Sequence, residues 1–413
     1  MQKHATSVKH IAIIGGGAAG FFAAVNCAKM YPQHHITIFE KGNKLLSKVR
    51  VSGGGRCNVT HACFDINLLA KNYPRGERQL KSPFSRFMTA DTVRWFEERG
   101  VRLKTEADGR MFPVSDSSQT IIDCLLHEAE KYRVHIETGT DVIRLDKKED
   151  GKIELTFRYD ERQLFDAVLI ATGGSPNATG FEWLRESGHE IVPPVPSLFT
   201  FNIPNNPLTG LMGVVAEKAK VEILQTKYSA SGPLLITHWG ISGPAVLKLS
   251  ALAARVLAGL NYHFRIRINW LNKFSEEELR SNLLRQKKDL AVRMIGIAHE
   301  SGLPRRLWQY LLDKSGISEN LQWAQLSKEQ VNRLLGYLRY DEYIVSGKTT
   351  FKEEFVTCGG VSLNDVDFKT MESKRVKGLY FAGEVLDIDA VTGGFNFQAA
   401  WSTGFVAGLA MGK

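Results

Sequence analysis

The chain has 413 residues, of which 43% are hydrophobic and 23% charged, and its net charge is +9. This length allows two or three domains with a large buried core, and the composition is ordinary for a soluble globular protein. The roughly 18 uninterrupted apolar residues of a membrane span are absent, and the first apolar run is too short for a signal peptide. The five cysteines lack a CxxC pair and zinc spacing, so we expect reduced thiols, no metal site and a cytoplasmic location.

The first predicted unit is a strand, a glycine turn and a helix. Residues 10–20 read HIAIIGGGAAG, with glycines that match the dinucleotide-binding fingerprint. In that fingerprint Gly15 permits the tight turn, Gly17 lets the backbone approach a pyrophosphate, and Gly20 lets helix and strand pack closely. A second short strand ends at Glu40, at the spacing expected of an acid that binds ribose hydroxyls. The pattern predicts a Rossmann-type βαβ unit, and its alternative is a plain turn with an exposed Glu.

A glycine-rich loop follows within residues 45–64, where residues 51–58 read VSGGGRCN. Three consecutive glycines cost conformational entropy, so the segment is either a flexible hinge or a backbone that lies flat against a ligand. In the second case Arg56 and Asn58 supply hydrogen bonds, and Lys48 lies near the pyrophosphate.

Two later strands favour FAD as the dinucleotide. Residues 166–174 (DAVLIATGG) and 378–384 (GLYFAGE) each form a short apolar run that ends in small residues. The ends of such strands line the ligand crevice of a parallel sheet. Glu384 could bond a ribityl hydroxyl of FAD. The remaining residues at these strand ends are Ala171, Thr172, Gly173 and Gly383.

Composition and periodicity divide the chain. Five prolines between 193 and 207 indicate a domain crossing, and alternating strands follow. Capping boxes that start at Ser275 and Ser327 indicate a helical insert. We expect an FAD-binding domain in two segments around a composite insert, with these ranges: 1–193 first FAD segment, 194–270 β-rich domain, 271–340 helical insert, 341–357 return strand, 358–413 second FAD segment.

Four segments resemble one family. SGGGRCN, GRMFPVSD at 109–116, THWGISGPAVLKLS at 237–250, and GLYFAGEVLDIDAVTGGFNFQAA at 378–400 are similar to the BaiN/YhiN-like bacterial flavoproteins, from about residue 9 to the C-terminus. The resemblance implies an α/β, glutathione-reductase-like FAD-binding domain with an inserted antiparallel β-barrel-like domain and a helical subdomain. It implies an FAD-dependent oxidoreductase, and one member is linked to reduction of steroid-like enones. Ala390 departs from the family, which frequently has glycine there.

The fingerprint and the resemblance together define the candidate residues. The start of the last predicted helix, residues 393–398, is expected to face the flavin, where its dipole would stabilise the anionic reduced form; the alternative is a core helix. The candidate FAD contacts are Gly15, Gly17, Ala18, Ala19, Gly20, Glu40, Lys41, Lys48, Gly54, Gly55, Arg56, Cys57, Asn58, Val142, Ala171, Thr172, Gly173, Gly383, Glu384, Gly394, Phe395, Asn396 and Phe397.

Two residues are candidates for catalysis. His238 could protonate a substrate as hydride arrives, and its alternative is a histidine that only bonds a backbone carbonyl. Arg110 could clamp an anion or a carbonyl. The predicted function is hydride transfer from NADH or NADPH through FAD to a small organic substrate such as an enone. The alternatives are a flavin-dependent RNA-modifying enzyme, which the basic charge suggests, and a non-catalytic flavin-binding redox protein.

Partners follow from the same features. The basic residues are spread along the chain, so we expect neither nucleic acid nor membrane as a partner. The sequence leaves the oligomeric state open. Only one dinucleotide fingerprint is visible, and it is assigned to FAD. A nicotinamide donor is therefore expected to share the substrate's face of the flavin.

Overall fold

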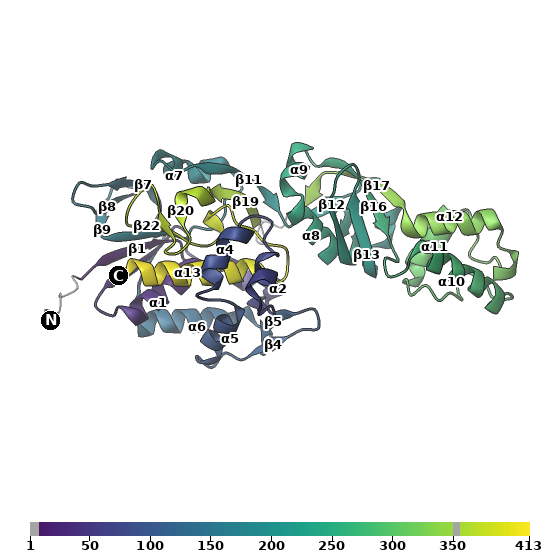
Figure 1. Ribbon diagram of the computed structural model, residues 1–413, viewed down its shortest axis with the longest axis horizontal. Helices are drawn as coiled ribbons and strands as arrows, with labels where there is room; N and C mark the ends of the chain where they lie inside the picture. Colours follow the sequence, from purple (N-terminus) through teal and green to yellow (C-terminus); the bar gives the residue numbers. More distant parts are fainter. Residues whose placement is uncertain (1–7, 350–355) are drawn as a thin grey trace. The chain divides into compact units, whose positions relative to one another are not determined.

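The computed structural model describes residues 8–349 and 356–413 and divides into two compact units (Figure 1). Unit 1 comprises Met1–Ser197 and Phe351–Lys413, and unit 2 comprises Leu198–Thr350. The return strand expected over 341–357 falls partly on residues 350–355, which lie outside the described residues. Within the described ranges, no helix is long and apolar enough to cross a membrane.

A seven-stranded sheet forms the centre of unit 1, in the order β20-β21-β22-β10-β1-β2-β6. The five strands from β22 to β6 are parallel, and β20 and β21 form an antiparallel edge. Since β1 pairs with β2 on one side and β10 on the other, the strand order changes direction at β1, where α/β sheets bind ligands. The strands are β1 (His10–Ile14), β2 (His35–Glu40), β6 (His135–Thr138), β10 (Ala167–Ile170), β20 (Val366–Asp367), β21 (Glu372–Ser373) and β22 (Leu379–Phe381).

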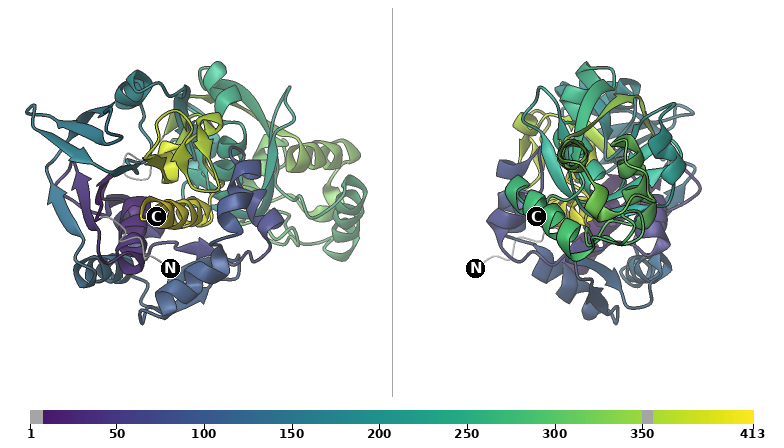
Figure 2. Two further views of the ribbon diagram at one scale, coloured as in Figure 1. Left: turned by 60° about the vertical axis from the view of Figure 1, so that its left-hand side comes forward. Right: turned by 90° about the vertical axis from the view of Figure 1, so that its right-hand side faces the viewer.

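Two helices from opposite ends of the chain lie side by side in unit 1 (Figures 1 and 2). They are α1 (Ala18–Met30) and α13 (Phe395–Met411). A Cβ atom on Gly404 would lie 2.7 Å from the carbonyl oxygen of Ala19, and Gly408 makes the same approach one turn further on. The two backbones therefore touch, which only glycine at these positions permits.

Smaller elements surround this core. The strand that begins at Ile153 ends at Phe157, because the chain turns there and leaves Tyr159 91% exposed. The other elements of unit 1 are the helices α2 (Ser47–Gly55), α3 (Ile66–Ala70), α4 (Glu77–Phe84), α5 (Thr89–Glu97), α6 (Ser118–Lys131) and α7 (Glu182–Glu186), and the strands β3 (Thr60–His61), β4 (Leu103–Thr105), β5 (Arg110–Pro113), β7 (Val142–Lys147), β8 (Ile153–Phe157), β9 (Arg162–Phe165), β11 (Ile191–Ser197) and β19 (Val356–Val361).

Unit 2 is built on an antiparallel sheet in the order β17-β16-β13-β14-β15-β12-β18. One residue, Gly347, separates β17 from β18; the first pairs with β16 and the second with β12. The two ends of the sheet thus meet in one stretch of chain, which gives the sheet a barrel-like closure. The strands are β12 (Thr200–Asn202), β13 (Val215–Ile223), β14 (Ser229–Thr237), β15 (Gly240–Ser242), β16 (His263–Asn269), β17 (Asp341–Ser346) and β18 (Lys348–Thr349).

The helices of unit 2 fall into two groups. α8 (Pro244–Leu252) packs on the sheet and is followed by α9 (Ala254–Gly259). The predicted helical insert contains α10 (Glu276–Asp289), α11 (Arg305–Lys314) and α12 (Lys328–Arg339), and both predicted capping boxes are present.

A buried carboxylate fixes this insert to the sheet. Asp341 is 0% exposed, accepts hydrogen bonds from Trp270 Nε1 at 3.0 Å and Tyr343 Oη at 2.6 Å, and pairs with Lys314. Lys314 is the last residue of α11, Trp270 directly follows β16, and Asp341 is the first residue of β17. This cluster therefore joins a helix of the insert to the sheet.

Candidate functional site

Two glycines close the turn between β1 and α1 because no side chain fits there. A Cβ atom on Gly15, whose φ is +114°, would lie 2.4 Å from the carbonyl oxygen of Ala171. A Cβ atom on Gly20 would lie 2.0 Å from the carbonyl oxygen of Gly15. Both distances are far below van der Waals contact. The strand and the helix can approach this closely only through glycine.

Gly17 stands in a different environment, since a Cβ atom there would meet no atom within 4 Å. It is the N-cap of α1; no side chain caps the helix and no acidic residue lies in its first turn. The backbone N–H groups of Ala18, Ala19 and Gly20 therefore start a helix whose positive end is left for an anion. The open space at Gly17 fits a dinucleotide pyrophosphate, and a side chain at this position would fill it.

Glu40 lies beside this turn. Its carboxylate accepts one hydrogen bond from Gly16 N and another from Gly42 N, both at 2.8 Å. The side chain is therefore held at the glycine turn, where an acid can reach ribose hydroxyls. Of the other two candidates on this side, Lys41 is exposed and Val142 is buried at the start of β7.

The ends of β10 and β22 meet on the other side of β1. Glu384 pairs through Oε2 with Lys48 Nζ at 2.7 Å and accepts from Thr357 N through Oε1 at 2.9 Å. A Cβ atom on Gly174 would lie 2.6 Å from Glu384 Oε1. The neighbouring Gly173 has a φ of +73° and open space around its Cβ position. Strand ends far apart in sequence, together with Lys48, thus surround one corner of the sheet.

The prediction of a loop from residue 45 is wrong at its start, because α2 begins at Ser47 and the buried Val49 anchors its first turn. Helical geometry stops at Ser52. The next three residues have φ values of +59°, +69° and +84°, a left-handed run that requires glycine. At Gly54 and Gly55 a Cβ atom would meet nothing within 4 Å, so this backbone has an open side.

Asn58 joins the glycine segment to α13. With its amide in the orientation that satisfies both groups, the nitrogen donates to Thr60 O at 3.0 Å and the oxygen accepts from Gly394 N at 2.9 Å. Gly394 is the N-cap of α13, and a Cβ atom there would lie 2.5 Å from Thr60 O. The start of α13 is therefore fixed against residues 58–60. Near it, Asn396 Oδ1 accepts from Ala390 N, Phe395 stacks on His61, and Phe397 stacks on Trp401.

Cys57 is fully buried, and burial raises the pKa of its thiol to about 12, against the opposing hydrogen bond with Ser52. The thiol is therefore protonated near neutral pH, and it offers neither a nucleophile nor a metal ligand in that state. Within the described part of the chain, no cluster of three His, Cys, Asp or Glu is placed to hold a metal ion.

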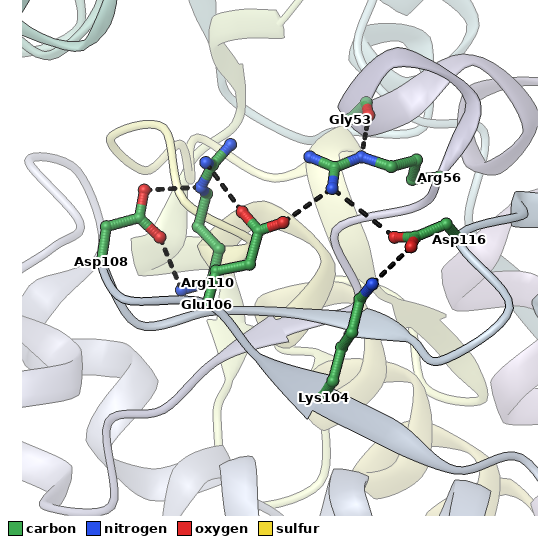
Figure 3. A network of polar contacts seen from close by, with 7 residues as sticks. All are labelled: Gly53, Arg56, Lys104, Glu106, Asp108, Arg110 and Asp116. Carbon is green, nitrogen blue, oxygen red and sulfur yellow. Dashed lines mark hydrogen bonds and ion pairs between the residues drawn. The ribbon is translucent and has the colours of Figure 1, made fainter.

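Arg56 and Arg110 both hold carboxylates of the protein (Figure 3). Arg56 pairs with Glu106 at 2.7 Å and with Asp116 at 3.5 Å. Arg110 pairs with the same Glu106 at 2.9 Å and with Asp108 at 2.7 Å. The two candidate ligand-binding cations thus share one acid on the β4–β5 hairpin, and a ligand that binds either of them must compete with it.

This network also braces the glycine segment. The Arg56 guanidinium lies 4.0 Å from the centre of the Phe112 ring, and the Glu106 hydrogen bond raises its pKa. Lys104 hydrogen bonds Asp116 and lowers the pKa of that carboxyl. A Cβ atom on Gly53 would lie 2.9 Å from Phe112, so the segment packs directly on this ring.

His238 belongs to unit 2. It is exposed at the turn between β14 and β15, with its ring 4.3 Å from that of Trp239. Trp239 Nε1 donates to Thr200 Oγ1 at 2.9 Å, which fixes the turn. All the other candidate residues belong to unit 1.

Sequence reasoning missed three groups of residues at the site. Thr357 contacts Glu384 through its backbone, and its signal was the small-residue run at 357–360. The side-chain oxygen of Gln398, in the first turn of α13, accepts hydrogen bonds from the hydroxyl groups of Thr60 and Thr92, and no sequence motif indicates these contacts. Glu106 pairs with both arginines and Asp116 pairs with Arg56, and only the position of these acids around a hairpin could have indicated it.

Comparisons with known proteins agree with this architecture. The family model "HI0933-like protein Rossmann domain" matches residues 9–410. The ribosomal RNA dihydrouridine synthase of Haemophilus influenzae is 29% identical over 97% of this chain and 98% of its own length. The 3-dehydro-bile acid delta(4,6)-reductase of Clostridium scindens is also 29% identical, over 98% of this chain and 99% of its own.

A solved structure shows the same fold. The 3-ketosteroid-delta4-(5alpha)-dehydrogenase of Rhodococcus jostii is 12% identical, with a TM-score of 0.52 over 99% of this chain and 98% of that one. The family match confirms the resemblance to BaiN/YhiN-like flavoproteins, and the open, uncapped helix start at Gly17 fits FAD. The chain therefore belongs to the HI0933-like Rossmann family and is an FAD-dependent oxidoreductase.

Proposed function

We propose that this protein reduces a carbon–carbon double bond conjugated to a carbonyl group, with hydride taken from NADH or NADPH. The observation that carries the proposal is that two relatives with equal identity across almost their whole length have names that imply this one reaction. Dihydrouridine is uridine with a saturated C5–C6 bond next to the C4 carbonyl. A 3-dehydro-bile acid with Δ4 and Δ6 double bonds is a conjugated enone.

The proposed FAD contacts are those that the sequence predicts. The first turn of α1 and Gly17 hold the pyrophosphate, and Glu40 binds the adenosine ribose. Glu384, oriented by Lys48 and Thr357 N, binds a ribityl hydroxyl. When bound, FAD would supply the transfer of hydride between the donor and the substrate. The uncapped start of α13 stabilises negative charge near it.

His238 is the proposed proton donor. Reduction of a conjugated double bond places hydride on the β-carbon and requires a proton at the α-carbon. His238 is exposed on a turn that Trp239 anchors, and an imidazole can carry the proton that the α-carbon requires. Arg110 is the proposed group that binds the substrate's carbonyl oxygen, in exchange for one of its acidic partners.

The charge of the protein distinguishes two substrate classes. A small enone requires no excess of basic residues, whereas RNA binding depends on them. The spread of basic residues along the sequence predicts no nucleic acid partner, but unit 2 contains 20 lysines and arginines against 12 acids, and this concentration of the net charge of +9 favours a uracil base within RNA. We therefore place RNA before the small enone as substrate class.

The test is reduction of the purified flavoprotein by NADH or NADPH without oxygen, followed by reoxidation with either acceptor. The acceptors are a steroid enone and a uridine-containing RNA transcript. Flavin reoxidation with saturation of the double bond, detected by mass spectrometry, supports the proposal. Reoxidation by oxygen alone contradicts it.

The donor and the acceptor are expected to bind in turn. Unit 2 has an antiparallel sheet over its described residues 198–349, and no second βαβ unit for a nicotinamide dinucleotide occurs there. The donor must then leave before the acceptor binds, which predicts parallel lines in double-reciprocal plots. Intersecting lines contradict a shared face.

A further inference from the structure

We propose that unit 2 is the RNA-binding part of this protein, and that a basic cluster at the junction of its sheet and helical insert holds the phosphate backbone. The inference rests on the proposed function for its choice of RNA, but its structural argument is independent. It concerns where charge lies, not which bond is reduced.

The excess positive charge is confined to one unit. Unit 1 contains 33 lysines and arginines against 32 aspartates and glutamates, so it is almost neutral. Unit 2 contains 20 against 12, although it is the smaller unit. Eight of the nine net charges therefore lie outside the unit that contains the predicted FAD site. A basic excess of this size on one unit is the electrostatic pattern of polyanion binding.

Six of the twelve acidic residues of unit 2 form ion pairs with its own cations. Glu342 accepts from both Arg265 at 2.6 Å and Arg267 at 2.8 Å. Asp341 is buried with Lys314. One acid thus serves two cations on the sheet face, and another is withdrawn from the surface. The acids that remain are fewer than the remaining cations of unit 2.

Four exposed cations lie on the segments where the sheet meets the helical insert. We call Lys218, Lys273, Arg305 and Arg306 the junction cluster. The Lys218 carbonyl accepts from the backbone N–H of Asn272, the neighbour of Lys273. Lys273 Nζ lies 4.0 Å from the Cβ position of Gly302, three residues before Arg305. Arg306 donates to the carbonyls of Gly210 and Met212 at 2.7 and 3.3 Å.

No ion pair within the described residues neutralises any member of the junction cluster. All four side chains belong to exposed residues. The neighbouring Met212 is 56% exposed, and Lys273 lies 4.5 Å from the Phe274 ring centre. Cations beside an exposed apolar side chain suit a nucleic acid, which offers phosphates and base or sugar faces together.

The sequence of α11 supports the same interpretation. The positive end of a helix favours acids, and α10 follows this rule with three glutamates in its first turn. α11 instead begins with Arg305 and Arg306, and its first turn contains no acid and no side-chain cap. This arrangement is unfavourable for the isolated helix and becomes favourable when a phosphate binds beside it.

The test compares two quadruple variants of the full-length flavoprotein. In the junction variant, Lys218→Gln, Lys273→Gln, Arg305→Gln and Arg306→Gln are combined. The control variant removes the same charge from exposed cations of unit 1, through Lys29→Gln, Lys71→Gln, Arg78→Gln and Lys377→Gln. Binding of a fluorescein-labelled RNA hairpin is followed by anisotropy between about 50 and 200 mM KCl.

We expect the junction variant to bind the hairpin roughly tenfold to a hundredfold more weakly, with a salt slope lower by about 3. The control variant should bind like the wild type. Equal losses in both variants, or no loss in the junction variant, overturn the proposal, as does stronger binding to anionic phosphatidylglycerol vesicles than to RNA. If the junction variant unfolds, the pair Lys218→Gln and Lys273→Gln tests the same prediction, because both residues are exposed and their loss leaves the Arg306 hydrogen bonds in place.

Reoxidation of the reduced flavin by a small enone separates the two proposals. If RNA binding falls in the junction variant while the reaction with the enone is unchanged, both proposals are supported. If RNA binds as expected but neither RNA nor enone is reduced, the proposed function fails and unit 2 remains an RNA-binding unit. If the enone is reduced and RNA does not bind, the inference about unit 2 fails alone.

Discussion

Units 1 and 2 differ in which part of each residue carries the distinctive features, the backbone in unit 1 and the side chains in unit 2. In unit 1 the features are in the backbone: glycines, helix starts and strand ends at one edge of a parallel sheet, in a unit with almost no net charge. In unit 2 the backbone is an ordinary closed antiparallel sheet with helices, and the distinctive feature is the excess of basic side chains. The comparison teaches that a cofactor site depends on main-chain shape, whereas a surface for a polyanion depends on charge.

The strongest test of this contrast is Gly20→Ala in unit 1. Its Cβ atom would lie 2.0 Å from Gly15 O, so the strand and helix must separate. We expect the free energy of unfolding to fall by about 3 kcal/mol, measured by urea denaturation. Gly336→Ala in unit 2 is the matched control, because its Cβ position is open and it lies inside α12; a gain of about 0.5 kcal/mol is expected there. A tolerated Gly20→Ala would contradict the close approach.

Asp341→Asn tests unit 2 in the same way. The change removes the charge that compensates Lys314 and leaves the hydrogen bonds of Trp270 and Tyr343 with a weaker acceptor. We expect a loss of about 3 kcal/mol in unfolding experiments, with unchanged flavin content in the folded fraction. Loss of FAD at native conditions would show that the two units are not independent in this respect.

Gly17→Val should separate binding from stability. The Cβ position at Gly17 is open and its φ of −95° suits any residue, so the free energy of unfolding without flavin should change by less than about 1 kcal/mol. The valine side chain would fill the space that we assign to the pyrophosphate. We expect the purified variant to be colourless, with the FAD released on denaturation reduced more than about tenfold. A variant with full flavin content would sink that assignment.

The smallest expected effect is common to both units. His189 in unit 1 is buried and His299 in unit 2 is half-buried, and removal from solvent lowers the pKa of each imidazole below its ordinary value of about 6.5. The unfolded chain therefore binds more protons than the folded one in mildly acidic solution. Stability should decline as the pH falls below about 6.5 and be constant for these groups above it. Thermal melting between pH 5 and 8 in His189→Gln and His299→Gln should show a weaker decline in each variant.

The sequence predicts local features whose cause is local. The glycine fingerprint, Glu40 at the end of its strand, and both capping boxes are present because turn geometry and helix starts depend on a few adjacent residues. The parallel core sheet follows from the same patterns, because buried strands that alternate with helices have few other arrangements.

Long-range pairing could not be predicted. Arg56 and Arg110 have sequences around them that suit a ligand contact, but the hairpin brings Glu106 to both. The helical start of α2 depends on burial of Val49, which the three following glycines concealed. The distribution of net charge between the two units could not be predicted either. Basic residues are spread along the sequence, and only the division of the chain into units shows where they accumulate.

The contact between α1 and α13 has a consequence for the order in which the protein forms on the ribosome. α1 is among the first elements to be synthesised, yet its packing partner begins at Phe395, near the end of the chain. Unit 2 is complete once residue 350 has emerged and can fold while translation continues. The nucleotide-binding edge must wait with part of its apolar surface uncovered until the final helix is released. Truncation after residue 394 would therefore leave a nascent chain with a folded unit 2 and an unfinished unit 1, a substrate for chaperones and proteases.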